Sequence, residues 1–229
     1  MKLRLWLLYA SLLAAIASCN APHPNEANLI SEMDSISYAV GMDIAQHYYQ
    51  NQNVELNPDL LYQGFRDQAL STDQKLSEEE MKALIKGFTD KLRAEHRAEM
   101  QKIASTNQKL EEEFLSENRT KSEVQELPSG LQYKVLGQGS GTSPKLDQVV
   151  KVNYEGRMLN GTVFTPRGER EIDLTATLLG LQEALTLMRP GDHWEVYVPA
   201  KMAWGEAERG PVTPNSLLIF DLELLEILP

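Results

Sequence analysis

Few side chains in this 229-residue sequence could support nucleophilic or metal chemistry. The single cysteine excludes an intrachain disulfide framework and any zinc site built from several cysteines. The four histidines lack the spacing of metal ligands, so solvated or packing roles are expected for His23, His47, His96 and His193. From these residues we expect neither a cofactor nor a metal site.

Composition limits the classes of partner. The chain has 33 acidic and 22 basic residues, a formal net charge of −11, and 42% hydrophobic residues. This hydrophobic fraction is enough for a packed core, which excludes wholesale disorder. Nucleic-acid binding is not expected, because it needs basic patches that meet phosphates. The length fits one large domain or two small ones.

The N-terminus has the pattern of a secretion signal over residues 1–18. Lys2 and Arg4 precede an apolar run from Leu5 to Ile16, and small residues follow it. The apolar run is shorter than the roughly 20 residues needed to span a bilayer. A cleaved signal is therefore expected, rather than a permanent transmembrane helix.

Cys19 directly follows the small pair Ala17-Ser18, an arrangement that resembles the bacterial lipobox. The resemblance implies that this cysteine is lipidated and that residues 19–28 form a polar tether to a membrane. The alternative is ordinary cleavage that leaves a free thiol. Asn20 is not the aspartate that typically retains such proteins at the inner membrane, so we expect a periplasm-facing lipoprotein of the bacterial envelope, at the outer membrane.

Residues 29–118 are expected to be helical. One buried stripe is predicted by apolar residues that recur at every fourth position, Ile36, Val40, Ile44 and Tyr48. Gly41 lies inside this stripe and lowers helix propensity, so we expect it at a close helix contact. Asn57-Pro58 has the pattern of an N-cap followed by proline at the first helical position.

A long helix is predicted to end this half. Ser77 and Glu80 form a capping-box pattern, and neither glycine nor proline occurs from Thr89 to Glu117. Such a helix would contain roughly 40 residues and measure about 60 Å. Because two or three helices make only a small core, we expect residues 29–118 to form a homodimer. A monomeric helical hairpin is the alternative.

The C-terminal half changes to short β-type runs after a polar linker at residues 119–127. Strands are predicted over residues 131–136, 149–154, 193–198 and 217–225, and one helix over residues 178–188. Antiparallel strands around one short helix predict an α+β domain over residues 128–229, which is an ordinary domain size.

Motifs in this half resemble, in order and spacing, the FKBP-type peptidyl-prolyl cis-trans isomerases. They are residues 127–133 (LPSGLQY), 152–156 (VNYEG), 161–164 (GTVF), 187–192 (LMRPGD), 198–205 (VPAKMAWG) and 214–225 (PNSLLIFDLELL). The N-terminal half is similar, more loosely, to the dimerising segment of Mip-like members, at residues 38–41 (YAVG), 63–67 (QGFRD) and 114–118 (FLSEN). The first resemblance covers residues 126–228 and implies an FKBP-like antiparallel sheet wrapped around one short helix.

The resemblance also implies a catalytic pocket that holds a proline ring. Its walls would be Tyr154, Phe164, Leu178, Val212 and Phe220. The backbone N–H of Leu178 would hold a substrate carbonyl. Plain core packing is the alternative role for the aromatic members of this set.

Three catalytic positions depart from the family pattern. Trp204 stands where a tyrosine usually donates to the substrate, and its indole N–H could take over that role. Thr165 replaces an aspartate that orients the pocket tyrosine, and it is shorter and uncharged. Leu181 replaces a tryptophan at the pocket floor, which removes an aromatic face. These departures imply isomerase activity that is reduced or shifted in substrate preference.

Taken with the signal, the resemblance implies a lipid-anchored homodimer that isomerises proline-containing unfolded or nascent exported polypeptides. Uncatalysed prolyl isomerisation takes tens of seconds or longer, so it can limit their folding. The alternative function is a lipid-anchored periplasmic chaperone or binding module with weak or vestigial isomerase activity.

Overall fold

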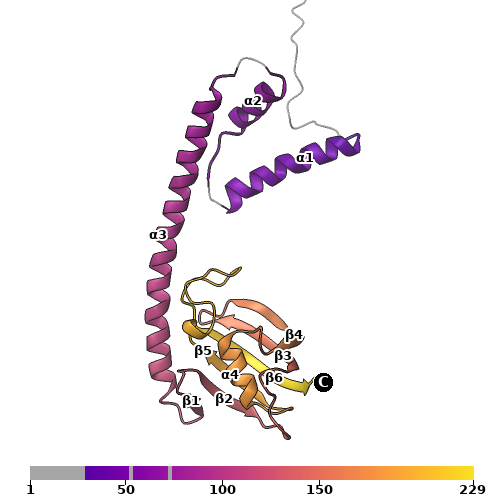
Figure 1. The fold of residues 1–229 in the computed structure, drawn as a ribbon. Coiled ribbons are helices and arrows are strands. Elements are labelled where there is room, and N and C mark those ends of the chain that lie inside the picture. The colour runs from indigo at the N-terminus through magenta and orange to yellow at the C-terminus, as the bar shows by residue number, and fades with distance from the viewer. Residues whose placement is uncertain (1–28, 52–53, 72–73) are drawn as a thin grey trace, which may run out of the picture. The chain divides into compact units, whose positions relative to one another are not determined.

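The computed structural model describes residues 29–51, 54–71 and 74–229, and the chain forms two compact units that divide between Glu78 and Glu79 (Figure 1). The predicted signal, Cys19 and the tether lie outside the described residues. Across the described ranges, none of the helices combines the length and the apolar character that a bilayer span requires.

The first unit begins with α1 (Glu32–Ala45), which continues into a π-helical turn, η2 (Gln46–Asn51). A reciprocal capping box starts α1. The Ser31 hydroxyl accepts a hydrogen bond from the N–H of Asp34 at 3.1 Å, and the Asp34 carboxylate accepts one from the N–H of Ser31 at 2.8 Å. Two of the free N–H groups at the helix start are satisfied in this way.

The second helix of this unit, α2 (Pro58–Ala69), starts as predicted from the sequence. Asn57 Oδ1 accepts hydrogen bonds from the N–H groups of Asp59 at 3.0 Å and Leu60 at 3.2 Å. Proline at the first helical position needs no partner for an N–H, which it lacks. The Asn57-Pro58 cap is therefore confirmed.

The apolar stripe of α1 is exposed in the single chain. Ile36 is 46% exposed, Val40 53% and Ile44 37%. A Cβ atom placed on Gly41 would meet nothing within 4 Å. Within the described chain, the expected burial of the stripe and the expected close contact at Gly41 are thus not made.

The second unit contains the predicted long helix. α3 (Glu78–Asn118) runs for 41 residues without a break. Its C-terminal end is anchored by a buried amide pair, in which Asn118 Nδ2 donates to Gln132 Oε1 at 3.0 Å and Gln132 Nε2 donates to the carbonyl of Leu115 at 2.9 Å. These bonds fix the end of the helix to the sheet that follows it.

That sheet has six antiparallel strands in the order β1-β2-β5-β6-β3-β4. The strands are β1 (Val124–Glu126), β2 (Gln132–Gly137), β3 (Val149–Met158), β4 (Val163–Asp173), β5 (His193–Val198) and β6 (Leu218–Ile227). β3 pairs with both β4 and β6, so that Gly156 lies opposite Thr165 on one side and Phe220 on the other.

Sequence patterns predict four of these strands and miss two. β1 lies inside the expected linker, and its three residues are too few for a pattern of alternation. β4 contains Pro166 and Gly168 among charged residues, so it lacks the alternation of a half-buried strand. It is tolerated because an edge strand needs a partner on one side only.

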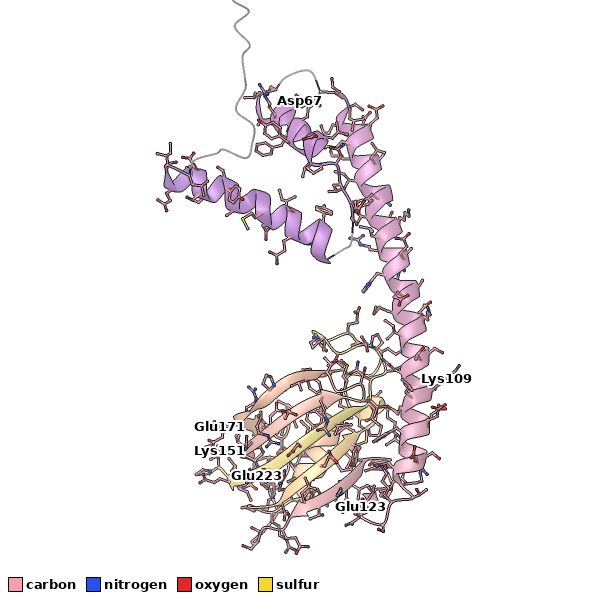
Figure 2. The ribbon with its side chains drawn as sticks, turned by 180° about the vertical axis from the view of Figure 1, so that it is seen from behind. Asp67, Lys109, Glu123, Lys151, Glu171 and Glu223 are labelled. Atoms are coloured by element: carbon pink, nitrogen blue, oxygen red, sulfur yellow. The ribbon has the colours of Figure 1, made fainter. Side chains whose placement is uncertain are left out.

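The two faces of the sheet are covered differently. α4 (Leu179–Leu187) packs on the inner face, the side of the sheet that bears Val152, Val196 and Leu222. The inner-face core has its largest fully buried side chains in Phe220, Leu131, Leu174, Leu185, Met188, Leu218, Leu222 and Leu224. α4 lies in front of the sheet in Figure 1, and Figure 2 views the second unit from the other side.

On the outer face, the C-terminal part of α3 contributes Phe114 and Leu115 to a second cluster with Tyr197, Leu217 and Ile219. The Phe114 and Tyr197 rings have their centroids 5.5 Å apart. α3 and the sheet thus share a hydrophobic contact, and the long helix is part of the second unit.

Candidate active site

Four aromatic side chains converge on the inner face of the sheet. The Phe164 ring meets Trp204 edge-on at a centroid distance of 5.5 Å and Phe220 edge-on at 5.7 Å. Tyr154 lies 6.0 Å from Phe220. We call these four residues the aromatic cluster. Edge-on contacts at such distances are the favoured arrangement of aromatic rings.

Gly156 allows this convergence. A Cβ atom at this position would lie 2.6 Å from Phe164 Cζ and 3.1 Å from Phe220 Cε1. The rings therefore occupy the space next to the strand that a side chain would fill. The sequence motif VNYEG includes this glycine, and the structure shows why a residue without a side chain is needed at this position.

The remaining apolar members of the predicted site surround the cluster. Leu181 on α4 is 3% exposed and Val212 is 3% exposed, and both belong to the same buried core as Phe220. Leu178 is half-buried against this core and directly precedes α4. Its carbonyl accepts from the N–H of Gln182 at 2.9 Å, whereas no described residue accepts a hydrogen bond from its own N–H.

Trp204 is carried by the long loop between β5 and β6. This loop starts with a 3-10 turn, η3 (Ala200–Met202), and is closed by a hydrogen bond from the N–H of Asn215 to the carbonyl of Gly205 at 2.7 Å. Gly205 has φ of +57°, a left-handed conformation that suits glycine. In the described part of the chain, the indole N–H of Trp204 has no acceptor, so both predicted donors of the site are unpaired.

α3 supports this loop from the other side. The Glu111 carboxylate accepts a hydrogen bond from the N–H of Ala200 at 2.7 Å, at the start of η3. Asn107 Nδ2 donates to the carbonyl of Pro214 at 2.7 Å and to the Thr213 hydroxyl at 3.0 Å. Burial raises the pKa of the Glu111 carboxyl, and the bond from Ala200 offsets part of that shift. The loop is thus held at both ends by one helix.

A cavity of about 290 Å³ lies beside this support, between α3 and the β3–β4 turn. Its lining residues are Asn107, Leu110, Met158, Leu159, Asn160, Thr213, Ser216 and Leu217. No predicted site residue is among them, so the cavity is separate from the aromatic cluster.

Thr165 and Arg170 occupy different places around Tyr154. Thr165 is half-buried on β4, and among the described residues no hydrogen bond joins its hydroxyl to Tyr154. Arg170, which sequence reasoning did not single out, has its guanidinium carbon 5.6 Å from the centroid of the Tyr154 ring. The position of Arg170 depends on the register of an unpredicted strand, and no sequence signal would have revealed it.

The outer face of the sheet, in contrast, carries paired charges. Asp221 accepts from Arg167 at 2.7 Å and is hydrogen-bonded to His193 Nε2 at 2.5 Å. Burial raises the pKa of Asp221, but these bonds outweigh it and hold the pKa below its usual value. Lys151 pairs with Glu169 at 2.7 Å. Figure 2 labels Lys151 and its neighbours Glu171 and Glu223 near one end of the sheet.

Comparisons with known proteins agree with this geometry. A domain family described as amino terminal to FKBP-type peptidyl-prolyl isomerase matches residues 33–135. A second family, described as FKBP-type peptidyl-prolyl cis-trans isomerase, matches residues 140–225, which include the aromatic cluster.

Similar proteins cover most of the chain. The outer membrane protein MIP of Legionella longbeachae is 34% identical over an alignment of 230 residues, which covers 98% of this chain and 98% of that one. The peptidyl-prolyl cis-trans isomerase Mip of Coxiella burnetii is 36% identical over an alignment of 204 residues, which covers 87% of this chain and 88% of that one. The crystal structure of FkpA from Escherichia coli has a TM-score of 0.63 at 26% identity and covers 87% of this chain and 98% of that chain. Because the identity extends over both halves and the fold agrees, the chain belongs to the FKBP-type peptidyl-prolyl cis-trans isomerase family.

Proposed function

We propose that this isomerase holds the proline ring of its substrate within the aromatic cluster and twists the preceding peptide bond there. The convergence of Tyr154, Phe164, Trp204 and Phe220 beside Gly156 is the observation that supports this most directly. Leu178, Leu181 and Val212 complete the apolar surroundings.

The chemistry needs an environment rather than a nucleophile. Amide resonance gives rotation about the X–Pro bond a barrier of about 18–20 kcal/mol. In the twisted state the amide loses resonance and part of its charge separation, so that it tolerates an apolar environment better than the planar state does. Surroundings that exclude water and hold the proline ring therefore stabilise the twisted state selectively.

Two unpaired donors supply the polar contacts in this proposal. The N–H of Leu178 holds a substrate carbonyl, and the indole N–H of Trp204 takes the part that a tyrosine hydroxyl plays in the family pattern. Thr165 places no carboxylate beside Tyr154, and Leu181 presents a smaller floor than an aromatic residue. We expect these two positions to lower the rate or shift substrate preference.

In this proposal the isomerase is a membrane-anchored homodimer, and three further features support it. The exposed stripe of α1 supports association of two copies through residues 29–118. The lipobox-like sequence before Cys19 supports a lipid anchor, and the name of the Legionella longbeachae relative supports an outer-membrane location. Unfolded or nascent exported polypeptides are then the natural substrates.

The test is a proline-peptide isomerisation assay on the soluble chain that begins at Asn20. We expect catalysis above the uncatalysed rate, with kcat/KM lowered about tenfold or more in Tyr154→Ala, which removes a wall of the cluster. Trp204→Phe keeps the ring and removes the donor, so a several-fold loss is expected.

Trp194→Phe is the matched control. Trp194 stacks on Tyr133 at 4.3 Å, outside the cluster, and its buried Nε1 has no hydrogen-bond partner among the described residues. Replacing tryptophan by phenylalanine at position 194 therefore removes no hydrogen bond, whereas at position 204 it removes the proposed donor. If the wild type and all variants match the uncatalysed rate while the chain still suppresses aggregation of an unfolded protein, the chaperone alternative replaces the proposal.

A further inference from the structure

Arg170 lies on the inner face of β4, the edge strand next to the aromatic cluster. Its partner in the sheet register is Val152, which is fully buried on that face. The guanidinium lies over the Tyr154 ring at 5.6 Å, and Nη2 donates to the carbonyl of Pro166 at 3.3 Å. A cation is therefore fixed at the border of the proposed proline site.

The charge of Arg170 differs from that of the other cations on these strands because it is not neutralised. Arg157 pairs with Glu195 and Arg167 pairs with Asp221, each at 2.7 Å on the outer face. Within the described ranges, Arg170 makes no ion pair.

The acidic residues on either side of Arg170 do not supply a partner. Glu169 is bound to Lys151 at 2.7 Å, and Glu171 lies opposite Lys151 in the sheet register. Alternation along a strand sends both of these side chains to the face opposite Arg170. Arg170 is thus an exposed positive group without a carboxylate partner among the described residues, and its charge is available to a ligand.

We propose that Arg170 is a specificity-determining residue, which makes this isomerase prefer substrates with a carboxylate side chain next to the proline. The inference rests on the proposed function, since it places the proline ring in the aromatic cluster. A guanidinium has a planar fork of donors that matches a carboxylate, and the contact with Tyr154 holds this fork in place. The proline and its acidic neighbour are then bound by adjacent groups.

The negative net charge of the molecule allows a local effect of Arg170 to be distinguished from a long-range electrostatic effect. A chain with a net charge of −11 repels acidic peptides through its long-range field. A preference for an acidic peptide over its neutral counterpart cannot come from that field. It must come from a local cation, and salt should weaken it.

The experiment uses the soluble chain and peptides that differ in one residue. Glutamate, glutamine or lysine is placed directly before or directly after the proline, and kcat/KM is measured at low and high salt. We expect the glutamate peptide to exceed the glutamine peptide by about two- to fivefold at low salt in at least one position, as for a partly exposed ion pair. The lysine peptide should be the poorest.

Variants assign the effect to one residue. Arg170→Gln should bring the ratio of glutamate to glutamine peptides to one or below, and Arg170→Lys should restore part of it. Arg167→Gln removes an arginine from the outer face of the same strand and should leave the ratio unchanged. A role for Arg170 in packing alone would lower kcat/KM for every peptide without changing the ratio.

Two results overturn the proposal. One is a wild-type ratio of one or less at both positions, and the other is a ratio that survives in Arg170→Gln. Activity on the glutamine peptide tests the proposed function separately. If no peptide is isomerised, binding of the same peptides to the Trp194→Phe variant is followed by the fluorescence of Trp204. The ratio of the dissociation constants of the glutamate and glutamine peptides then decides the role of Arg170.

Discussion

Gly156 sets how closely the aromatic rings approach β3. The rings of Phe164 and Phe220 occupy the volume that a side chain at this position would need, and the ring of Tyr154, two residues earlier in the strand, lies 6.0 Å from that of Phe220. The geometry of the proposed site is therefore controlled by a residue that has no functional group of its own.

Gly156→Ala should destabilise the second unit and disturb the site together. A Cβ atom 2.6 Å from Phe164 Cζ forces the ring to move, and overpacking of this kind costs about 1–3 kcal/mol of unfolding free energy. Urea unfolding and the isomerisation assay measure the two effects. Gly168→Ala in the neighbouring strand β4 is the control, because a Cβ atom there meets nothing within 4 Å. Equal stability of the two variants would contradict this account.

At the scale of elements, α3 is a support for the loop that carries Trp204. Glu111 and Asn107 contact opposite ends of this loop, while Phe114 packs on the outer face of the sheet. The long helix thus contributes to the position of a proposed catalytic residue through the loop that carries it.

The Glu111 contact predicts a pH dependence with a definite sign. Burial raises the pKa of this carboxyl above 4.5, so between 4.5 and the raised pKa the folded chain binds more protons than the unfolded chain. The contribution of Glu111 to stability is largest at low pH and falls as pH rises through that window. Glu111→Gln keeps an acceptor for Ala200 without the charge, and it should not show this decline.

Urea titrations at pH 4 to 8 compare the wild type with Glu111→Gln, and we expect the variant to be the more stable at the upper end. Glu111→Ala leaves the Ala200 N–H without its partner, so hydrogen exchange at that amide should accelerate in Glu111→Ala and not in Glu111→Gln. A wild type whose stability relative to Glu111→Gln rises with pH would contradict the assignment.

At the scale of the whole molecule, the first unit exposes an apolar surface that includes the stripe of α1. Exposed apolar residues in the first unit include Leu29, Ile30, Met33, Ile36, Val40, Ile44, Leu60, Leu61 and Phe65. A surface of this kind is typical of an interface, which supports the proposed homodimer.

Val40→Glu should convert the dimer to a monomer, because a charge in the centre of an apolar interface has no partner there. Sedimentation velocity or light scattering measures the mass. Ser35→Glu, on the far side of α1 by the helical repeat, is the control and should remain dimeric. Activity on short peptides should be unchanged in both variants, since the aromatic cluster belongs to the second unit. A wild type that sediments as a monomer would refute the homodimer.

Much of the architecture can be predicted from the sequence because it depends on local patterns. The strand at His193–Val198 alternates apolar and polar residues, the cap at Asn57 satisfies neighbouring N–H groups, and α3 contains no breaker in its final turns. The motif residues of the site are likewise found along the chain by their order. Each of these signals depends on residues that are near one another in sequence.

Tertiary structure alone decided the features that depend on register and on distant contacts. β4 becomes a strand through pairing with β3, despite Pro166, and this pairing places Arg170 beside Tyr154. The bond between Glu111 and Ala200 joins residues 89 positions apart. The sequence determined which residues could form a proline site, because types and order are local information. The fold decided that Arg170 borders that site and that α3 supports it, because the energy of pairing two distant segments depends on both segments together and cannot be predicted from the residues of either one.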